Sequence, residues 1–287
     1  MSFTGTQSWK LILVILLMFA NWSCEALKWR VLISHIQPIS FLKAFRAILS
    51  GLSVSLAMNT PNGAGEYVGR ILYIKEGNRL RAITLTFVGS ISQLIVTMLM
   101  GTIGIFLLRD NFVRATNVLG FSIRWSDALA YSSIAITTVL ILIYFEISVL
   151  IRLLEKIPFV ARYAYFIQKL EDFGWKELLK VLLVSILRYS VFVVQYLLLL
   201  QLFNVGIGTV SAMWLITIMF LVLAIIPTIA LAELGVRGKI SIFLFGMFST
   251  NTLGIVLTAS SIWLINLVVP ALAGSLFLLG IKLFRNK

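Results

Sequence analysis

The segment Met58–Arg70 reads MNTPNGAGEYVGR and joins two long apolar stretches of the chain. It contains one proline, three glycines, two asparagines, and a glutamate four residues before an arginine. Helix-breaking residues in this position indicate either an ordinary surface loop or a deliberate break in the backbone at membrane depth. The choice decides whether the fold is a plain bundle of helices or a bundle with interrupted helices.

The composition indicates that the chain lies in a membrane. Of its 287 residues, 60% are hydrophobic and 12% are charged, and the mean hydropathy is +1.02. A soluble domain is about one quarter charged, so the polar residues here are too few to cover a water-facing surface. The sequence therefore predicts an all-α, polytopic helical membrane protein. We expect a single integral membrane domain over residues 1–287, in the cytoplasmic (inner) membrane of a bacterium.

The net charge of +13 could suit nucleic acid, but the basic residues stand at the ends of apolar runs, as membrane anchors do. We therefore expect no nucleic-acid partner and expect the anionic headgroups of phospholipids instead. A membrane-protein partner or a homo-oligomer is a further alternative. Cys24 is the single cysteine and His35 the single histidine. Because they offer little to a metal site, we expect no metal and no other cofactor.

Runs of about 20 apolar residues predict the membrane spans. Six of them are residues 11–28, 41–59, 82–108, 127–152, 177–203 and 208–231. The stretch 239–283 has room for two more, with a break near 249–251 or 260–261. The prediction is thus seven to eight transmembrane helices with two broken or re-entrant segments. In segment 153–176, basic and aromatic residues alternate with apolar ones, which predicts a helix lying on the membrane surface.

The basic residues also predict an orientation. With eight spans, fifteen lysines and arginines fall on one side of the membrane and seven on the other. With seven spans, the numbers are twelve and ten. Because cytoplasmic loops carry an excess of these residues, the larger imbalance favours eight spans and places both termini in the cytoplasm.

A second segment, Ile225–Phe243, repeats the pattern of the first. Each has a proline, then a glutamate, then an arginine four residues later, with glycines nearby. These residues are Pro61, Glu66 and Arg70 in the first copy, and Pro227, Glu233 and Arg237 in the second. Paired glycine- and proline-interrupted segments in matching positions indicate the binding site of a transporter. The alternative is a pair of ordinary capped loops at the surface.

The sequence also predicts the local structure of the two repeated segments. The pseudo-repeat motifs lie near 58–76 and 225–248. In the first, we expect a short helix over about 62–76, entered through a break. Gly65 and Gly69 are four residues apart, so another helix can approach them closely. The glutamate and the arginine of each copy, also four apart, share one face of their helix.

Two further charged residues lie inside apolar runs, Glu146 in LILIYFEISVL and Arg188 in LLVSILRYSVFVVQ. A lone charge in hydrocarbon is costly, so each is expected to have a partner or a wet cavity beside it. A mutual ion pair between adjacent antiparallel helices is one alternative. Lining a cavity is the second, and extension to the membrane interface is the third.

The two repeated segments also carry a family resemblance. TPNGAGEYVGR (Thr60–Arg70), followed by an apolar span, and ELGVRGK (Glu233–Lys239), followed by two more, resemble the transmembrane region of lysylphosphatidylglycerol synthases. That region also occurs as stand-alone proteins in bacteria and archaea. The second segment departs from the usual Gly-Gly-Leu-Gly-Val-Arg-Glu pattern, because Ala232 and Glu233 replace the glycines and Gly238 replaces the final glutamate.

In those synthases, the region is linked with moving a modified phospholipid between leaflets, and a soluble aminoacyl-transfer domain follows it. The sequence here ends at Lys287, just after its last predicted span. The resemblance therefore implies the lipid-translocation half without the synthase half.

An enzyme is the alternative to a transporter for the same residues. The Glu-x-x-x-Arg spacing is also similar to that of membrane CAAX-type proteases, which need paired glutamates and histidines on other helices. Glu66 follows a glycine, His35 is alone, and there is no His-Glu-x-x-His pattern. We therefore expect no catalytic residues and no enzymatic activity.

The sequence thus predicts a flippase-like translocator of a phospholipid or lipid-linked substrate, with both motifs lining a cavity between the two halves. Each arginine would bind phosphate through its planar fork. The candidate substrate-binding residues are Glu66, Arg70, Glu233, Arg237, Glu146 and Arg188. The alternatives are a small-solute or ion transporter of the same architecture, and a non-catalytic membrane partner of a lipid-modifying or envelope-building enzyme.

Overall fold

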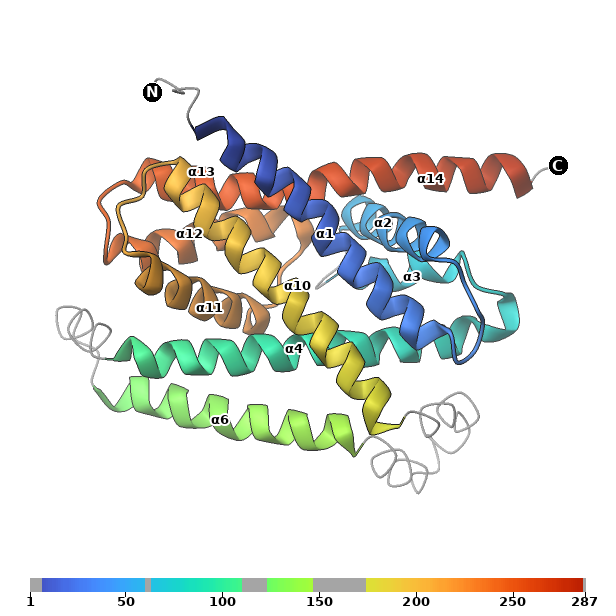
Figure 1. The fold of residues 1–287 in the computed structure, drawn as a ribbon, viewed down its shortest axis with the longest axis horizontal. Helices are drawn as coiled ribbons and strands as arrows, with labels where there is room; N and C mark the ends of the chain where they lie inside the picture. Colours follow the sequence, from blue (N-terminus) through green and yellow to red (C-terminus); the bar gives the residue numbers. More distant parts are fainter. Residues whose placement is uncertain (1–6, 60–62, 110–122, 147–173, 286–287) are drawn as a thin grey trace.

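The computed structural model describes residues 7–59, 63–109, 123–146 and 174–285. Within these ranges, helices form the fold and there is no strand (Figure 1), which confirms the all-α prediction there. The elements are α1 (Ser8–Ile33), α2 (Phe41–Met58), α3 (Gly65–Ile71), the 3₁₀ turn η2 (Glu76–Asn78), α4 (Arg79–Leu107), α6 (Ile123–Phe145), α10 (Trp175–Leu202), α11 (Thr209–Ile225), α12 (Ala230–Gly246), α13 (Thr252–Trp263), the π-helical segment η4 (Leu264–Val268) and α14 (Val269–Arg285).

In the described ranges, five helical stretches are long and apolar enough to cross a membrane. They are Ser8–Ile33, Phe41–Met58, Glu76–Leu107, Trp175–Leu202 and Thr252–Gly280. Two shorter apolar helices, Ala130–Phe145 and Thr209–Ile225, accompany them. Large apolar side chains such as Leu16, Leu187 and Leu276 stay exposed on the outer faces, as expected of side chains that face lipid. The finer count of spans and the side of the termini stay predictions.

Helices far apart in the sequence lie side by side (Figure 1). α1 and α10 run antiparallel along each other, and α4 and α6 do the same at one edge of the molecule. α4 also packs against α11, and α2 packs against both α3 and α14. This arrangement surrounds the interior with α1, α3, α4, α10, α11 and α12, and three of these helices (α3, α10 and α12) carry candidate residues.

The first predicted break is present. α2 ends at Met58, and Asn59 takes a left-handed conformation with φ 48°. Pro61 lies outside the described residues. After Gly63, which also has a positive φ of 72°, α3 runs only from Gly65 to Ile71. It is shorter than the predicted helix over 62–76, because residues 63–64 and 72–73 form turns and η2 begins at Glu76.

The predicted close approach of another helix occurs at Gly69. A Cβ atom there would lie 2.5 Å from the Cα of Gly51 on α2. No side chain fits in that space, so the backbones of α2 and α3 are in direct contact. α3 is thereby held directly against α2.

The second predicted break is also present, but its surroundings differ. α11 ends at Ile225, and Ile226 and Ile229 have extended backbone before α12 begins at Ala230. Pro227 lies inside this extended stretch, where its missing N–H costs no helical hydrogen bond. The break divides the predicted span 208–231 between α11 and α12.

The long apolar stretch 239–283 is interrupted once in the structure. α12 ends at Gly246, and the Asn251 side chain caps α13 by accepting a hydrogen bond of 2.9 Å from the Gly254 N–H. Of the two predicted breaks, the one near 249–251 is therefore observed. Residues 260–261 lie inside α13, which continues through η4 into α14. The predicted surface helix at 153–176 lies outside the described residues except for its last three positions.

Candidate functional site

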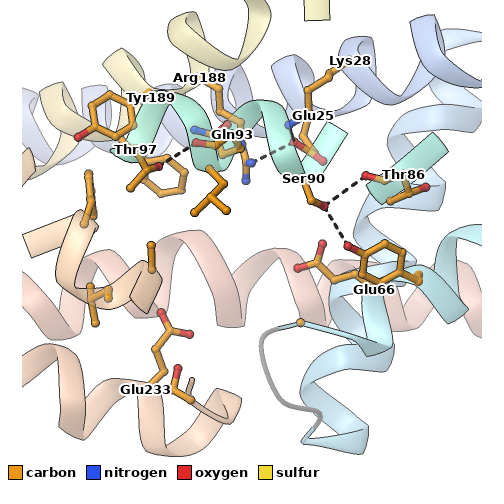
Figure 2. A pocket seen from close by; sticks show the side chains of 18 of the residues that line it. Glu25, Lys28, Glu66, Thr86, Ser90, Gln93, Thr97, Arg188, Tyr189 and Glu233 are labelled. Carbon is orange, nitrogen blue, oxygen red and sulfur yellow. Dashed lines mark hydrogen bonds and ion pairs between the residues drawn. The ribbon is translucent and has the colours of Figure 1, made fainter. Parts of the chain in front are cut away.

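A cavity of about 480 Å³ lies among α1, α3, α4, α10, α11 and α12 (Figure 2). It is lined by both repeated motifs. The structure brings five of the six candidate residues to its wall, namely Glu66, Arg70, Arg188, Glu233 and Arg237. The interrupted backbone contributes as well, since Gly63 of the first break and Thr228 of the second belong to the lining.

The Glu25 carboxylate is the centre of the charged groups in this cavity. One of its oxygens lies 3.1 Å from Arg70 Nη1, and the other lies 2.8 Å from Lys28 Nζ and 3.0 Å from Arg188 Nη1. Arg70 Nη2 also donates to Glu66, at 2.5 Å. Lys28, Arg70 and Glu25 expose 2%, 5% and 7% of their side chains. Charges buried this deeply are tolerated only when they are paired and hydrogen-bonded. We call Glu25, Lys28, Glu66, Arg70 and Arg188 the Glu25 cluster.

The helical geometry of α1 and α10 explains how this cluster forms. Asn21, Glu25 and Lys28 are spaced four and three residues apart, so they share one face of α1. α10 runs along that face and places Arg188 opposite Glu25. The Arg188 Nε–H donates to Asn21 Oδ1 at 2.8 Å. Its guanidinium also lies over the Trp22 ring, 5.1 Å from the ring centre. The guanidinium is therefore held by three residues of α1 in one orientation.

A buried contact connects this group to the π-helical segment. The Asn21 Nδ2–H donates to Asn266 Oδ1 at 3.1 Å, and both asparagines are buried. Asn266 lies in η4, where five residues adopt a π-helix between α13 and α14. Such segments inside α-helices are rare and frequently accompany functional sites. Asn21 thus joins Arg188 to the last helical stretch of the chain.

The second motif forms a separate pair on α12. Arg237 Nη2 donates to Glu233, which precedes it by one turn. The two side chains expose 14% and 27% of their surface. Arg237 also interacts with Tyr196 of α10. The ion-pair partner of each residue lies within the motif itself, whereas Arg70 of the first motif shares Glu25 with two other cations.

Polar and apolar side chains complete the wall. The α4 residues Thr86, Ser90, Gln93 and Thr97 recur at helical spacing, so they form a polar stripe along the cavity (Figure 2). The apolar lining residues are Leu94, Phe192, Phe220, Leu223 and Ala224. Among the described residues, no group of three histidine, cysteine, aspartate or glutamate side chains could hold a metal ion. The arrangement is suited to binding an anion by charge-assisted hydrogen bonds beside an apolar surface.

Glu146 is the candidate residue that the structure places elsewhere. It lies exposed at the end of α6 and is absent from the cavity lining. The mutual ion pair with Arg188 is not formed, because Arg188 has Glu25 as its carboxylate partner. The reason is the packing order: α6 lies against α4, whereas α1 lies along α10. Of the alternatives for Arg188, the cavity-lining position is the one observed.

Sequence reasoning missed two charged residues of the cavity wall, Glu25 and Lys28, and it also missed Asn21, which accepts a hydrogen bond from Arg188. The predicted span 11–28 ends at Lys28, which makes this lysine one of the basic residues at the ends of apolar runs that were expected to act as anchors. The structure corrects this: α1 continues to Ile33 and Lys28 is 2% exposed. The sequence does contain a signal for the longer helix, because the apolar residues after Arg30 continue the apolar run beyond Lys28 and Arg30.

Comparisons of the chain with known protein families, with curated proteins and with solved structures find no match. The resemblance to the transmembrane region of lysylphosphatidylglycerol synthases therefore stays a prediction. The assignment of function depends on the cavity itself.

Proposed function

We propose that this protein translocates a phospholipid or a lipid-linked substrate between the leaflets of the cytoplasmic membrane. The observation that carries the proposal is the charged cavity inside a bundle of apolar helices. Ionisable residues within membrane helices are expensive, and they mark substrate pathways when they face a cavity. The resemblance to a lipid-translocating region supports the same substrate class.

The dimensions and the chemistry of the cavity suit a lipid headgroup. Its volume of about 480 Å³ is within the range of about 300–1,000 Å³ that is typical of ligand pockets. Arginine and lysine side chains provide donors for a phosphate group. Phe192, Phe220 and Leu223 provide an apolar surface beside them. A lipid presents this same combination, since its headgroup is charged and its glycerol and acyl chains are not.

The two breaks in the backbone support a transport role rather than a static binding role. Each lies at the cavity, where Gly63 and Thr228 are part of the wall. Non-helical backbone at membrane depth is tolerated where it is buried in protein or lines a cavity. Discontinuous helices around a central site are the usual architecture of secondary transporters. The polar stripe on α4 would provide a path for the headgroup past these breaks.

The proposal is tested by a leaflet assay. The purified protein is reconstituted in vesicles that contain a fluorescent phospholipid, and the fraction accessible to a membrane-impermeant quencher is followed over time. We expect Arg70→Ala and Arg237→Ala to reduce the translocation rate about tenfold or more, since each removes a charged hydrogen-bond donor from the cavity. Arg79→Ala is the matched control, because Arg79 pairs with the exposed Glu76. Unchanged translocation in both cavity variants would remove these residues from the mechanism.

A small-solute or ion transporter is the second candidate. The observation that favours it is the polar stripe of α4, whose hydroxyl and amide groups could also pass a hydrated solute. Flux of a soluble anion into the same vesicles, without movement of the labelled lipid, would decide for this alternative.

A further inference from the structure

The charges around the cavity do not balance. Among the described residues that line it, seven side chains are charged at neutral pH. The cations are Lys28, Arg70, Arg188 and Arg237, and the carboxylates are Glu25, Glu66 and Glu233. The cavity wall therefore carries one positive charge in excess.

The excess lies at one end of the cavity. Arg237 and Glu233 neutralise each other on α12. The remaining three cations share two carboxylates, and all five belong to the Glu25 cluster. An uncompensated charge in a buried site costs several kcal/mol unless a counter-charge occupies the site. The Glu25 cluster is therefore the end at which a ligand would supply the missing negative charge.

The cluster also has hydrogen-bond donors to spare. Lys28 has three N–H groups and Arg70 has five, yet Lys28 forms one ion pair, with Glu25, and Arg70 forms two, with Glu25 and Glu66. The Nε–H groups of Arg70 and Arg237 are both buried and have no acceptor, so the excess charge, and not these donors, distinguishes the Glu25 cluster from the second motif. A buried donor left without an acceptor costs about 1–3 kcal/mol. An oxyanion placed at the cluster could provide acceptors and the charge together.

A phosphodiester fits these requirements. It carries one negative charge, and its two free oxygens match the planar fork of a guanidinium. Its two ester substituents would need apolar or weakly polar surroundings, which Phe192, Phe220 and Leu94 offer in the same cavity. A zwitterionic headgroup has a phosphate too, but its ammonium group would restore the excess positive charge.

We propose that the cavity selects a substrate whose headgroup carries one net negative charge and binds its phosphate at the Glu25 cluster rather than at Glu233–Arg237. This inference deepens the proposed function by naming the substrate class of the same cavity. It departs from the symmetric expectation that the arginine of each motif binds a phosphate, because the arginine of the second motif is already neutralised.

The test measures binding without transport. The full-length protein in detergent is titrated with dihexanoyl phosphatidylglycerol, with dihexanoyl phosphatidylcholine and with inorganic phosphate, and heat is recorded. We expect the phosphatidylglycerol, with one net negative charge, to bind at least about tenfold more tightly than the zwitterionic phosphatidylcholine. Equal binding of the two lipids, or no binding of either, would overturn the proposal.

The third ligand distinguishes a lipid from a free anion. Phosphatidylglycerol that binds more tightly than inorganic phosphate supports the lipid headgroup. Inorganic phosphate that binds as tightly, and competes with the lipid, overturns the lipid source and assigns the cluster to a free phosphate. These comparisons use the wild-type chain, so they do not depend on whether a variant folds.

Two variants test the position of the site by changing its charge in opposite directions. Lys28→Met removes the excess positive charge, so it should weaken phosphatidylglycerol binding about tenfold. Glu66→Gln increases the excess and frees donors of Arg70, so it should tighten binding. Arg79→Met and Glu76→Gln apply similar changes to an exposed pair away from the cavity and should leave binding unchanged. A shift in the same direction for both cavity variants would contradict the charge argument.

The outcome can be separated from that of the leaflet assay. A protein that binds phosphatidylglycerol selectively but does not translocate lipid would retain the anion site and lose the proposed function. A protein that translocates lipids with no preference for anionic headgroups would retain the function and lose this inference.

Discussion

The two Glu-x-x-x-Arg motifs line one cavity but are held in different ways. In the first motif, Arg70 is buried and shares Glu25 with two other cations, and α3 touches the backbone of α2 at Gly69. In the second, Arg237 has Glu233 of its own helix as its carboxylate partner. A Cβ atom added at Gly235 or Gly238 of α12 would have no heavy atom within 4 Å apart from the nearby backbone of its own helix.

The difference shows that a sequence pattern sets the local pairing but not its energetics. Within each motif, the spacing of four residues is sufficient to bring the carboxylate and the guanidinium together. The neighbouring helix determines how strongly each pair is held, since α1 brings a buried carboxylate to the first motif. The first motif is thus part of a network of five charged side chains, whereas the second is a single ion pair that contacts Tyr196 of α10 and has free space around its glycines.

The largest loss of stability is expected for a substitution of Glu25. Glu25→Gln removes the carboxylate that three buried cations share, and should destabilise the protein by about 3 kcal/mol or more. The measurement is thermal unfolding of the purified protein in detergent, followed by tryptophan fluorescence. Glu76→Gln, at an exposed glutamate, is the control and should change stability little. Equal melting temperatures for the two variants would show that the Glu25 cluster is not a fixed network.

The contact between α2 and α3 provides the second comparison. In Gly69→Ala, the new methyl group would lie 2.5 Å from the Gly51 Cα, and overpacking of this kind costs about 1–3 kcal/mol. The matched change is Gly238→Ala, which meets open space and should stabilise α12 by up to about 1 kcal/mol through helix propensity. The same unfolding measurement applies to both. Changes of the same sign would contradict the described difference in packing.

Sequence reasoning reached the parts of this structure that depend on local chemistry. Apolar runs predicted the long helices, and proline with glycine predicted both breaks, because these residues oppose helical backbone wherever they occur. The spacing of glutamate and arginine predicted which residues share a helix face. Four of the five candidate residues that line the cavity, Glu66, Arg70, Glu233 and Arg237, belong to these two motifs.

The parts of the site that the sequence did not predict depend on which helices are neighbours in the fold. Glu25 and Arg188 are 163 residues apart in the chain, and no local pattern indicates that α1 lies along α10. Without that contact, an ion pair with Glu146 was one of three alternatives left open for Arg188. Lys28 was misinterpreted for a related reason, since a lysine near the end of an apolar run resembles a cytoplasmic anchor until its buried partner is known.

A smaller loss of stability is expected for a substitution of Asn21. Asn21→Leu keeps a similar volume but removes the acceptor of Arg188 Nε and the donor to Asn266, which should cost about 1.5 kcal/mol of stability. Because Arg188 would lose one of its fixed contacts, phosphatidylglycerol binding should weaken severalfold as well, by about 1 kcal/mol. Unfolding and titration together check this. A stability loss with unchanged binding would assign Asn21 to packing alone.

The smallest effect on stability is expected at Glu233, and it is the sharpest test of the comparison. Glu233→Gln breaks an i,i+4 pair whose side chains are both partly exposed, so the expected cost is about 0.5 kcal/mol. Its counterpart Glu66→Gln breaks the same spacing at Arg70, whose side chain is 5% exposed against 14% for Arg237, and should cost more. In the titration, Glu233→Gln releases Arg237 from its partner and increases the positive charge at the far end of the cavity. If the anion binds at the Glu25 cluster, its affinity should rise less in Glu233→Gln than in Glu66→Gln. A larger gain in Glu233→Gln would move the anion site to α12 and make the second motif the one that binds the headgroup.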